Sequence, residues 1–159
     1  MKIRLLCAVF VLCLTSSIYA EEVSSPSPST DGLFIGIGPE AAAHTRKGAA
    51  IGGVFAGGFG FGSQFAAGLK TAYFNNLDTI SAVEPLAFFR YYLPVLPGSF
   101  VQAEVGCVVY FENGENFPAF SGGLSAGWRF SFSNYYIEPT LRFGYPHMWG
   151  AGLMAGYKF

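Results

Sequence analysis

Residues 135–145 read Tyr-Tyr-Ile-Glu-Pro-Thr-Leu-Arg-Phe-Gly-Tyr and alternate between two kinds of side chain. One set of alternate positions is apolar or aromatic throughout: Tyr135, Ile137, Pro139, Leu141, Phe143 and Tyr145. The other set holds the charged residues Glu138 and Arg142. A period of two predicts a β-strand with one apolar face and one polar face.

Neighbouring segments repeat this alternation. Large apolar residues occupy even positions in residues 120–132 and odd positions in residues 149–159. Breaks rich in Gly, Pro, Asn and Ser separate eight such segments, and they fall near residues 45–48, 62–63, 75–78, 94–99, 112–116, 133–134 and 146–148. Each segment has roughly ten residues, the length of a tilted strand that crosses a bilayer.

The charged residues share one face. When the apolar residues define the outward face of each segment, nine charged residues point inward: Glu40, Lys70, Glu84, Arg90, Glu104, Arg129, Glu138, Arg142 and Lys158. Residues 79–93 are apolar on both faces, so there the charges themselves choose the register. A soluble barrel has apolar residues inside and polar residues outside. The pattern here is the reverse, as expected of a barrel that is surrounded by lipid.

Composition agrees with this assignment. Charged residues make up 12% of the chain, against about 25% in ordinary soluble domains. The net charge of −1 argues against nucleic acid as a partner. We therefore predict an all-β fold, an eight-stranded antiparallel up-and-down transmembrane β-barrel with both ends in the periplasm.

One competing architecture starts from residues 48–69, which carry no charge and are long enough for a transmembrane helix. The same stretch is rich in glycine, which disfavours a helix. Its small residues also alternate with Ile51, Phe55, Phe59 and Phe61, so a strand with a narrow inner face is the preferred interpretation.

The N-terminal region has a different character. Residues 1–20 combine a basic start, a short apolar run and a small residue, Ala20, which predicts a signal peptide. Residues 21–31 predict a flexible periplasmic lead-in, and residues 32–159 the barrel. We therefore expect the protein to be exported to the outer membrane of a diderm bacterium. After cleavage Cys107 is the single cysteine; it falls on the predicted lipid face with no partner for a disulfide.

Two structural details are also predicted. Pro39, Pro85 and Pro139 lie inside strands beside glutamates, and bulges are expected there because proline cannot donate to the sheet ladder. Aromatic residues at the strand ends, including Tyr91 and Tyr92, predict girdles at the two membrane interfaces.

The last residues, Gly156-Tyr157-Lys158-Phe159, follow apolar residues at every second position and resemble the final strand of small outer-membrane barrels of the OmpX, Ail and opacity-protein type. Met154 stands where the common form of that ending has glycine. The resemblance implies that Tyr157 and Phe159 form the signal read by the outer-membrane assembly machinery. Family members include adhesins, complement-evasion factors and narrow channels, so the resemblance does not name a function.

The sequence contains few residues that could form a catalytic or metal-binding site. His44 and His147 are the two histidines, and neither has a serine two residues away. Closure of the barrel brings the first and last strands together, so the two rings can approach, but two histidines alone make a weak metal site. We expect no enzyme activity, no cofactor and no metal, and two rim histidines in water.

Function is therefore sought in the interior and at the rim. The inward charges predict a charge-paired, mostly closed interior and a structural or weak surface-interaction role. The alternative is a narrow channel for small or apolar solutes. Candidate outer-loop residues are Arg46, Lys47, Glu112 and Glu115. Expected partners are outer-membrane lipid with lipopolysaccharide or its equivalent, the assembly machinery, and a possible host surface ligand.

Overall fold

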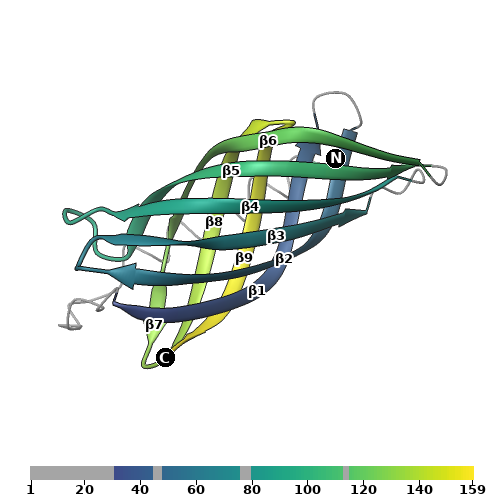
Figure 1. Cartoon of the computed structure of the whole chain (residues 1–159). Helices are drawn as coiled ribbons and strands as arrows, with labels where there is room; N and C mark the ends of the chain where they lie inside the picture. Colours follow the sequence, from purple (N-terminus) through teal and green to yellow (C-terminus); the bar gives the residue numbers. More distant parts are fainter. Residues whose placement is uncertain (1–30, 45–47, 76–79, 113–114) are drawn as a thin grey trace, which may run out of the picture.

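The computed structural model describes residues 31–44, 48–75, 80–112 and 115–159. Antiparallel strands follow one another along the chain (Figure 1). Their bounds are β1 (Gly32–His44), β2 (Gly48–Phe61), β3 (Phe65–Asn75), β4 (Ser81–Tyr92), β5 (Ser99–Glu112), β6 (Glu115–Trp128), β7 (Phe130–Phe132), β8 (Tyr135–Tyr145) and β9 (His147–Lys158). The predicted signal peptide and residues 21–30 of the lead-in lie outside the described residues.

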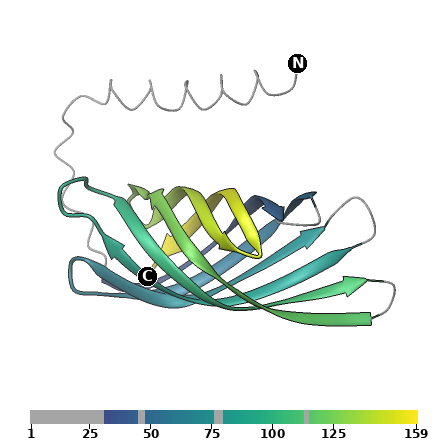
Figure 2. The same ribbon diagram turned by 90° about the horizontal axis from the view of Figure 1, so that it is seen from above.

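The sheet closes on itself. Its strand order is β6-β5-β4-β3-β2-β1-β9-β8-β7, and β6 also pairs with β8. Pairing of Phe34 with Lys158 joins β1 to β9, and pairing of Gly122 with Tyr145 joins β6 to β8. Figure 2 shows the yellow β9 closing the wall opposite the teal strands. Closure removes the free sheet edges that a bilayer cannot solvate.

β6 and β7 are two parts of one barrel strand. Gly127 pairs with Thr140 and Phe130 pairs with Ile137, so both parts keep the same register against β8 across Arg129. The predicted eight-stranded antiparallel barrel is confirmed. The helical alternative for residues 48–69 is wrong, because β2 and β3 form a hairpin in which Phe61 pairs with Phe65. No helix among the described residues is long and apolar enough to cross a membrane.

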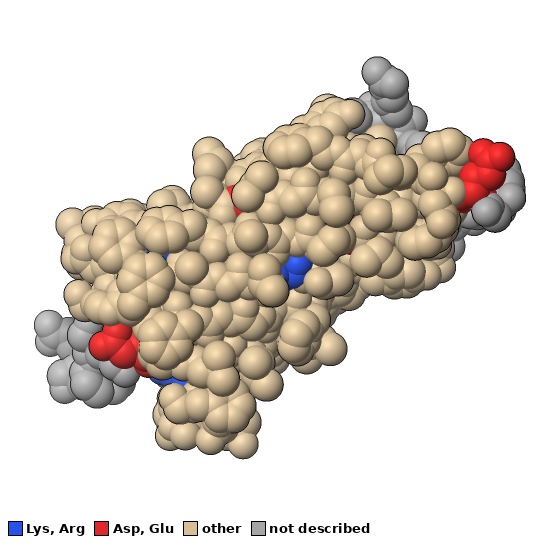
Figure 3. All heavy atoms as spheres, viewed as in Figure 1, with Lys and Arg blue, Asp and Glu red and all other residues tan. Residues whose placement is uncertain are grey.

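The outer surface of the barrel is apolar. Ile51 and Leu69 are 71% and 69% exposed, and large apolar residues are exposed on every strand. Figure 3 shows a largely uncharged surface between acidic patches at the two ends. Cys107 is exposed on this surface, as predicted. Such a belt is stable only against lipid, because monomeric soluble proteins rarely expose large apolar patches.

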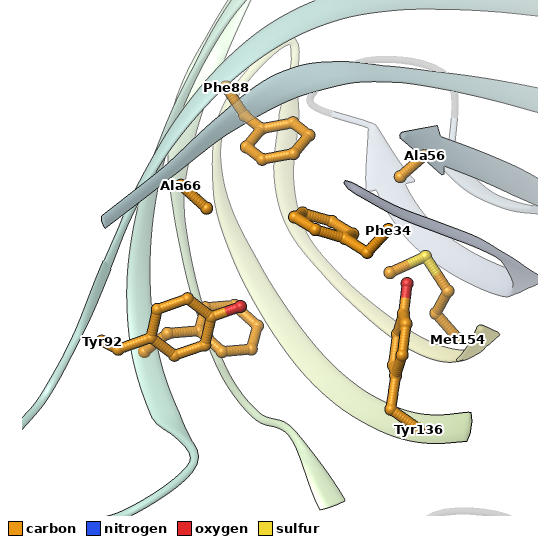
Figure 4. Close-up of a cluster of buried hydrophobic side chains, with 8 residues drawn as sticks. Phe34, Ala56, Ala66, Phe88, Tyr92, Tyr136 and Met154 are labelled. Atoms are coloured by element: carbon orange, nitrogen blue, oxygen red, sulfur yellow. The ribbon is translucent and has the colours of Figure 1, made fainter. Parts of the chain in front are cut away.

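Two apolar clusters lie inside the barrel. One is built around Phe34, Phe88, Phe100 and Tyr136. Figure 4 labels Phe34, Phe88 and Tyr136, whose side chains point into the interior. The other contains Phe74, Val108 and Tyr110, and lies toward the end opposite to Gly32 and Phe159. We call that end the outer end and the end near Gly32 and Phe159 the inner end.

The prolines do not produce the predicted bulges. Pairing of β4 with β5 skips Glu84 and Pro85 but resumes in the same register at Leu86, and Pro139 pairs directly with Leu153. Proline removes a hydrogen-bond donor without inserting a residue, so the ladder loses a bond and keeps its register. The β1–β9 register shifts instead between Ala43 and His44.

The assignment of Tyr92 to the aromatic girdle is also wrong. Tyr92 is buried in the interior cluster, whereas the neighbouring Tyr91 points the other way. Adjacent residues of a strand face opposite sides of the sheet, so both tyrosines cannot contact lipid.

Candidate functional site

Arg142 of β8 is the hub of a charged layer in the middle of the barrel. Its Nη1 and Nη2 donate to Glu84 Oε2 and Oε1 at 2.5 and 2.8 Å. Its Nε lies 3.1 Å from Glu104 Oε2, and its Nη1 lies 3.6 Å from Glu40 Oε1. Two parallel N–H···O bonds to one carboxylate form the strongest ion-pair geometry available to arginine. The three carboxylates come from β1, β4 and β5, so Arg142 links strands across the barrel.

Lys70 completes this layer from β3. Its Nζ lies 2.9 Å from Glu40 Oε2 and 3.6 Å from Glu104 Oε1. Ser125 Oγ donates to Glu104 Oε1 at 2.7 Å, and Ser121 Oγ donates to Glu84. We call Glu40, Lys70, Glu84, Glu104 and Arg142 the central network.

A second layer lies nearer the inner end. Arg90 Nη1 donates to Glu138 Oε2 at 2.9 Å, and Arg129 Nε donates to the same oxygen. The Arg90 guanidinium carbon lies 3.8 Å from the Phe100 ring centroid. The corresponding distance from Arg129 to Tyr136 is 4.2 Å. Guanidinium groups over aromatic faces gain a cation–π interaction.

We call this second layer the aromatic plug. It comprises Arg90, Arg129 and Glu138 with the rings of Phe34, Tyr92, Phe100 and Tyr136. Tyr136 Oη donates to the Ile35 carbonyl oxygen at 2.9 Å, which fixes its ring across the interior. Large rings and long cations thus occupy the cross-section at this level, as expected of a barrel with eight strands.

Gln102 connects the two layers. Arg90 Nε donates to Gln102 Oε1 at 2.8 Å, and Gln102 Nε2 donates to Glu104 Oε1 at 2.7 Å. A small cavity lies between the layers, with Lys70, Arg90 and Glu138 in its wall. Polar and apolar groups both line it, and it has room for water, which commonly completes the hydrogen bonding of buried polar groups.

The histidines form a third group at the outer end. His44 Nε2 lies 2.9 Å from Tyr110 Oη, and the His44 and His147 ring centroids are 5.6 Å apart. His147 is only 2% exposed, and its ring lies 4.9 Å from that of Phe74. The prediction that the rings can approach is therefore correct, whereas a water-exposed His147 is wrong. His147 begins β9 and is buried, with the rings of Phe74 and His44 against it.

The two charged layers have opposite net charge. Glu40, Glu84 and Glu104 carry three negative charges against two positive charges on Lys70 and Arg142, which leaves −1. In the aromatic plug, two arginines face Glu138 alone, which leaves +1. The interior is balanced as a whole, and each layer offsets the excess charge of the other. Such balance matters because an unpaired charge in a low-dielectric interior is strongly destabilising.

The remaining candidate residues occupy several environments. Eight of the nine charged residues assigned to the interior are buried, and Lys158 is partly exposed at the inner end, 3.5 Å from Ser131 Oγ. Glu112 is half-buried and Glu115 is exposed at the outer tips of β5 and β6. Arg46 and Lys47 lie outside the described residues. Tyr157 is half-buried on the last strand, and Phe159, just beyond it, is 67% exposed.

Several members of the interior were not singled out from the sequence. Gln102, Ser121 and Ser125 each hydrogen-bond to a buried glutamate. Their signal was present, because each occupies the inward parity of its strand next to charged positions. Among the described residues, no group of three or more His, Cys, Asp or Glu side chains could hold a metal ion.

No known protein-family model matches this chain, and no curated protein matches its sequence. Its structure is similar to neisserial surface protein A, with a TM-score of 0.67, 12% identity, and coverage of 81% of this chain and 98% of that one. It is also similar to the outer membrane protein OprG from Pseudomonas aeruginosa, with a TM-score of 0.65, 12% identity, and coverage of 85% and 99%.

A third similar structure is Ail, the attachment invasion locus protein of Yersinia pestis, in complex with the heparin analogue sucrose octasulfate. Its TM-score is 0.52 at 16% identity, with coverage of 81% of this chain and 99% of that one. The fold is therefore that of the small eight-stranded outer-membrane barrels, which confirms the predicted resemblance at the level of fold. This fold and the apolar exterior together support the predicted outer-membrane location.

Proposed function

We propose that this protein is a non-catalytic, closed barrel of the outer membrane, with a structural role. The observation that carries the proposal is the aromatic plug. Arg90 and Arg129 share one carboxylate and stack against four rings in the same cross-section. The central network lies beyond the plug, so a solute would have to break two layers of ion pairs to pass. Each broken buried pair costs about 3–5 kcal/mol.

Planar-bilayer recording of the refolded protein tests the closed interior. We expect no large, steady single-channel conductance. The double variant Phe34→Ala/Tyr136→Ala removes two aromatic rings from the plug and leaves every charged side chain in place. Its conductance should rise above that of the wild type. A matched double variant on the lipid face, Phe55→Ala/Tyr73→Ala, removes one Phe and one Tyr ring outside the barrel and should stay closed.

The alternative function, a narrow channel for small or apolar solutes, predicts a different result. In that case the wild type itself conducts, or small solutes enter vesicles that contain it. Either finding for correctly folded wild type would replace the structural proposal with the channel.

A weak surface-interaction role is the second part of the proposal. The feature that favours it is the outer tip of β5 and β6, where Glu112 and Glu115 pair across the hairpin (Figure 1). Ail, which shares this fold, has been solved with a sulfated heparin analogue. Acidic side chains at this tip disfavour such a polyanion and favour a basic host surface ligand.

Binding of the refolded protein to immobilised polylysine tests this role. The double variant Glu112→Gln/Glu115→Gln should weaken binding, whereas Gln64→Asn at the inner end should not. Equal binding by all three proteins would exclude the tip as a binding surface.

The proposed partners also include lipid and the assembly machinery. Lipopolysaccharide or an equivalent lipid would contact the exposed apolar belt. Phe159 is exposed, and its ring lies 5.1 Å from that of Tyr157. Removal of Phe159 should lower the yield of assembled barrel in cells while the purified chain still refolds into detergent. Equal yields in cells would exclude the recognition role.

A further inference from the structure

The turn between β4 and β5 presents apolar side chains at the inner end of the barrel (Figure 1). Residues 93–98, which form most of it, read Leu-Pro-Val-Leu-Pro-Gly. Val95 is 80% exposed and Leu96 is 47% exposed. The other two turns at this end are polar, with Gly-Ser-Gln at residues 62–64 and Ser-Asn at residues 133–134. The apolar surface therefore belongs to one turn of the three. We call residues 93–98 the apolar turn.

The backbone of the apolar turn forms hydrogen bonds within the turn. Leu93 N donates to the Ser99 carbonyl oxygen at 2.9 Å, and Ser99 N donates to the Leu96 carbonyl oxygen at 3.0 Å. Ser99 Oγ donates to the same Leu96 oxygen at 2.7 Å. Pro94 and Pro97 have no N–H that would need an acceptor. The turn therefore needs few hydrogen bonds from water, which lowers the cost of placing it where water is scarce.

Gly98 joins the apolar turn to aromatic side chains on the outer surface. Its carbonyl oxygen accepts a hydrogen bond from Arg129 N at 2.7 Å, and a Cβ atom on it would meet Trp128 Nε1 at 3.0 Å. Trp128 is 36% exposed and has the same facing on β6 as the exposed Leu124. Its ring is stacked on that of Phe130, with the centroids 6.2 Å apart. Because Trp favours the membrane interface, the turn lies where a bilayer surface is expected.

A lipid bilayer fits this surface better than a charged or polar partner does. Residues 91–103 contain no charged side chain, so the turn offers no ion pair that would orient such a partner. Val101 follows the turn on β5, is 45% exposed and belongs to the apolar outer surface. The apolar turn thus continues the lipid-facing belt past the ends of the strands, and the same lipid can cover both.

We propose that the apolar turn is a membrane-insertion loop. Val95 and Leu96 enter the leaflet that surrounds the inner end of the barrel and contact the acyl chains of its phospholipids. Exposed apolar side chains beside a Trp ring are the combination with which proteins insert into a bilayer interface. The two polar turns stay among the head groups or in water, so the inner end is anchored on one side. The inference rests on the outer-membrane location and stands whether or not the barrel conducts.

Electron paramagnetic resonance of the refolded protein in vesicles of dioleoylphosphatidylcholine tests the loop. In a chain of residues 21–159 with Cys107 replaced by serine, Val95→Cys, Ser63→Cys or Val105→Cys carries a nitroxide label. Collisions of the label with oxygen, which concentrates in lipid, are compared with collisions with a water-soluble nickel complex.

The two other positions calibrate the measurement. Val105 is 55% exposed in the middle of β5 and reports the lipid-facing belt, whereas Ser63 is exposed in a polar turn at the inner end. We expect the oxygen-to-nickel ratio at position 95 to be closer to the ratio at position 105 than to that at position 63. The same label at position 63 controls for any attraction of the nitroxide itself to lipid.

A charge in the apolar turn should move it out of the lipid. With the label on Leu96→Cys, addition of Val95→Asp should lower the oxygen-to-nickel ratio toward that of position 63. Ser63→Asp places the same charge in a polar turn and should leave the ratio at position 96 unchanged. Val95 and Ser63 are both exposed, so neither change removes a buried contact. Heat-dependent gel mobility shows whether each variant is folded, and Leu96→Cys replaces Val95→Cys if the latter does not fold.

Three results would overturn the proposal. The first is a ratio at position 95 equal to that at position 63 while position 105 reports lipid, which would leave the turn in water and available to a protein partner. The second is an unchanged ratio at position 96 in the folded Val95→Asp variant. The third is a water-like ratio at position 105 as well, which would contradict the membrane barrel itself and with it the proposed function.

Discussion

Arg142 and Glu84 form a bidentate ion pair across the interior, with N–O distances of 2.5 and 2.8 Å between strands β8 and β4. Glu84 is completely buried, and Ser121 adds a further hydrogen bond to the same carboxylate. The pair ties opposite walls of the barrel together. It is also the point where the central network comes nearest to His147.

Loss of Arg142 should destabilise the barrel more than loss of any rim charge. Arg142→Ala leaves Glu84 buried without its cation, and we expect a fall of about 3–5 kcal/mol in the free energy of unfolding. Urea titration in lipid vesicles and heat-dependent gel mobility measure this. Lys158→Ala at the inner end is the matched control and should cost less than about 1 kcal/mol. Unchanged gel mobility for Arg142→Ala would remove Arg142 from this role.

Removal of both partners should cost less than removal of one. In Arg142→Met/Glu84→Gln neither residue is charged, and Glu40 and Glu104 keep Lys70 as their shared cation. We expect the double variant to recover part of the stability lost by Arg142→Ala in the same urea titration. Additive losses in the corresponding double-mutant cycle would show that the two residues act independently.

Charge placed on the outer surface should be costly in a depth-dependent way. Leu69 is exposed near the middle of β3, and Leu69→Arg should lower the free energy of unfolding by about 2–4 kcal/mol in a bilayer. Phe61→Arg, at the end of β2, should cost about 0–1 kcal/mol for its charge. Equal losses at the two positions would contradict the assigned lipid belt.

Tyr136 requires a glycine beside it. A Cβ atom on Gly156 would collide with the Tyr136 ring and with the Ile35 carbonyl oxygen. Gly156→Ala should therefore destabilise the barrel by about 1–3 kcal/mol, as other overpacked interiors do. A Cβ on Gly57 would meet its nearest atom at 3.7 Å, so Gly57→Ala is the matched control and should be close to neutral. Equal effects of the two changes on urea unfolding would show that Tyr136 adapts.

Strand number and facing follow from the sequence because a bilayer allows only one side of each strand to carry charge. Residues 135–145 show this directly: every odd position is apolar, and both charges are even. The facing of residues 79–93 needed the charges themselves, since Ala82 and Leu86 are as apolar as Val83 and Phe89.

The partners inside the barrel do not follow from the sequence. The alternation of apolar and polar residues indicates that Arg142 and Glu84 both face inward. Their contact, however, depends on the stagger between two strands, and the two residues are 58 positions apart in the sequence. His147 illustrates the same difficulty at a rim. A strand that begins one residue earlier or later moves His147 between water and the barrel interior. The local sequence does not fix the end of a strand to one residue.

Lipid contact along β8 shows directly whether this chain forms a transmembrane barrel whose strands alternate between lipid and interior. In a chain of residues 21–159 with Cys107 replaced by serine, single cysteines at positions 140, 141, 143 and 144 carry a fluorescent label in vesicles of brominated lipid. We expect strong quenching at positions 141 and 143 and weak quenching at positions 140 and 144, because alternate residues face lipid and the closed interior. Equal quenching at all four positions, or stronger quenching at positions 140 and 144, would contradict this arrangement.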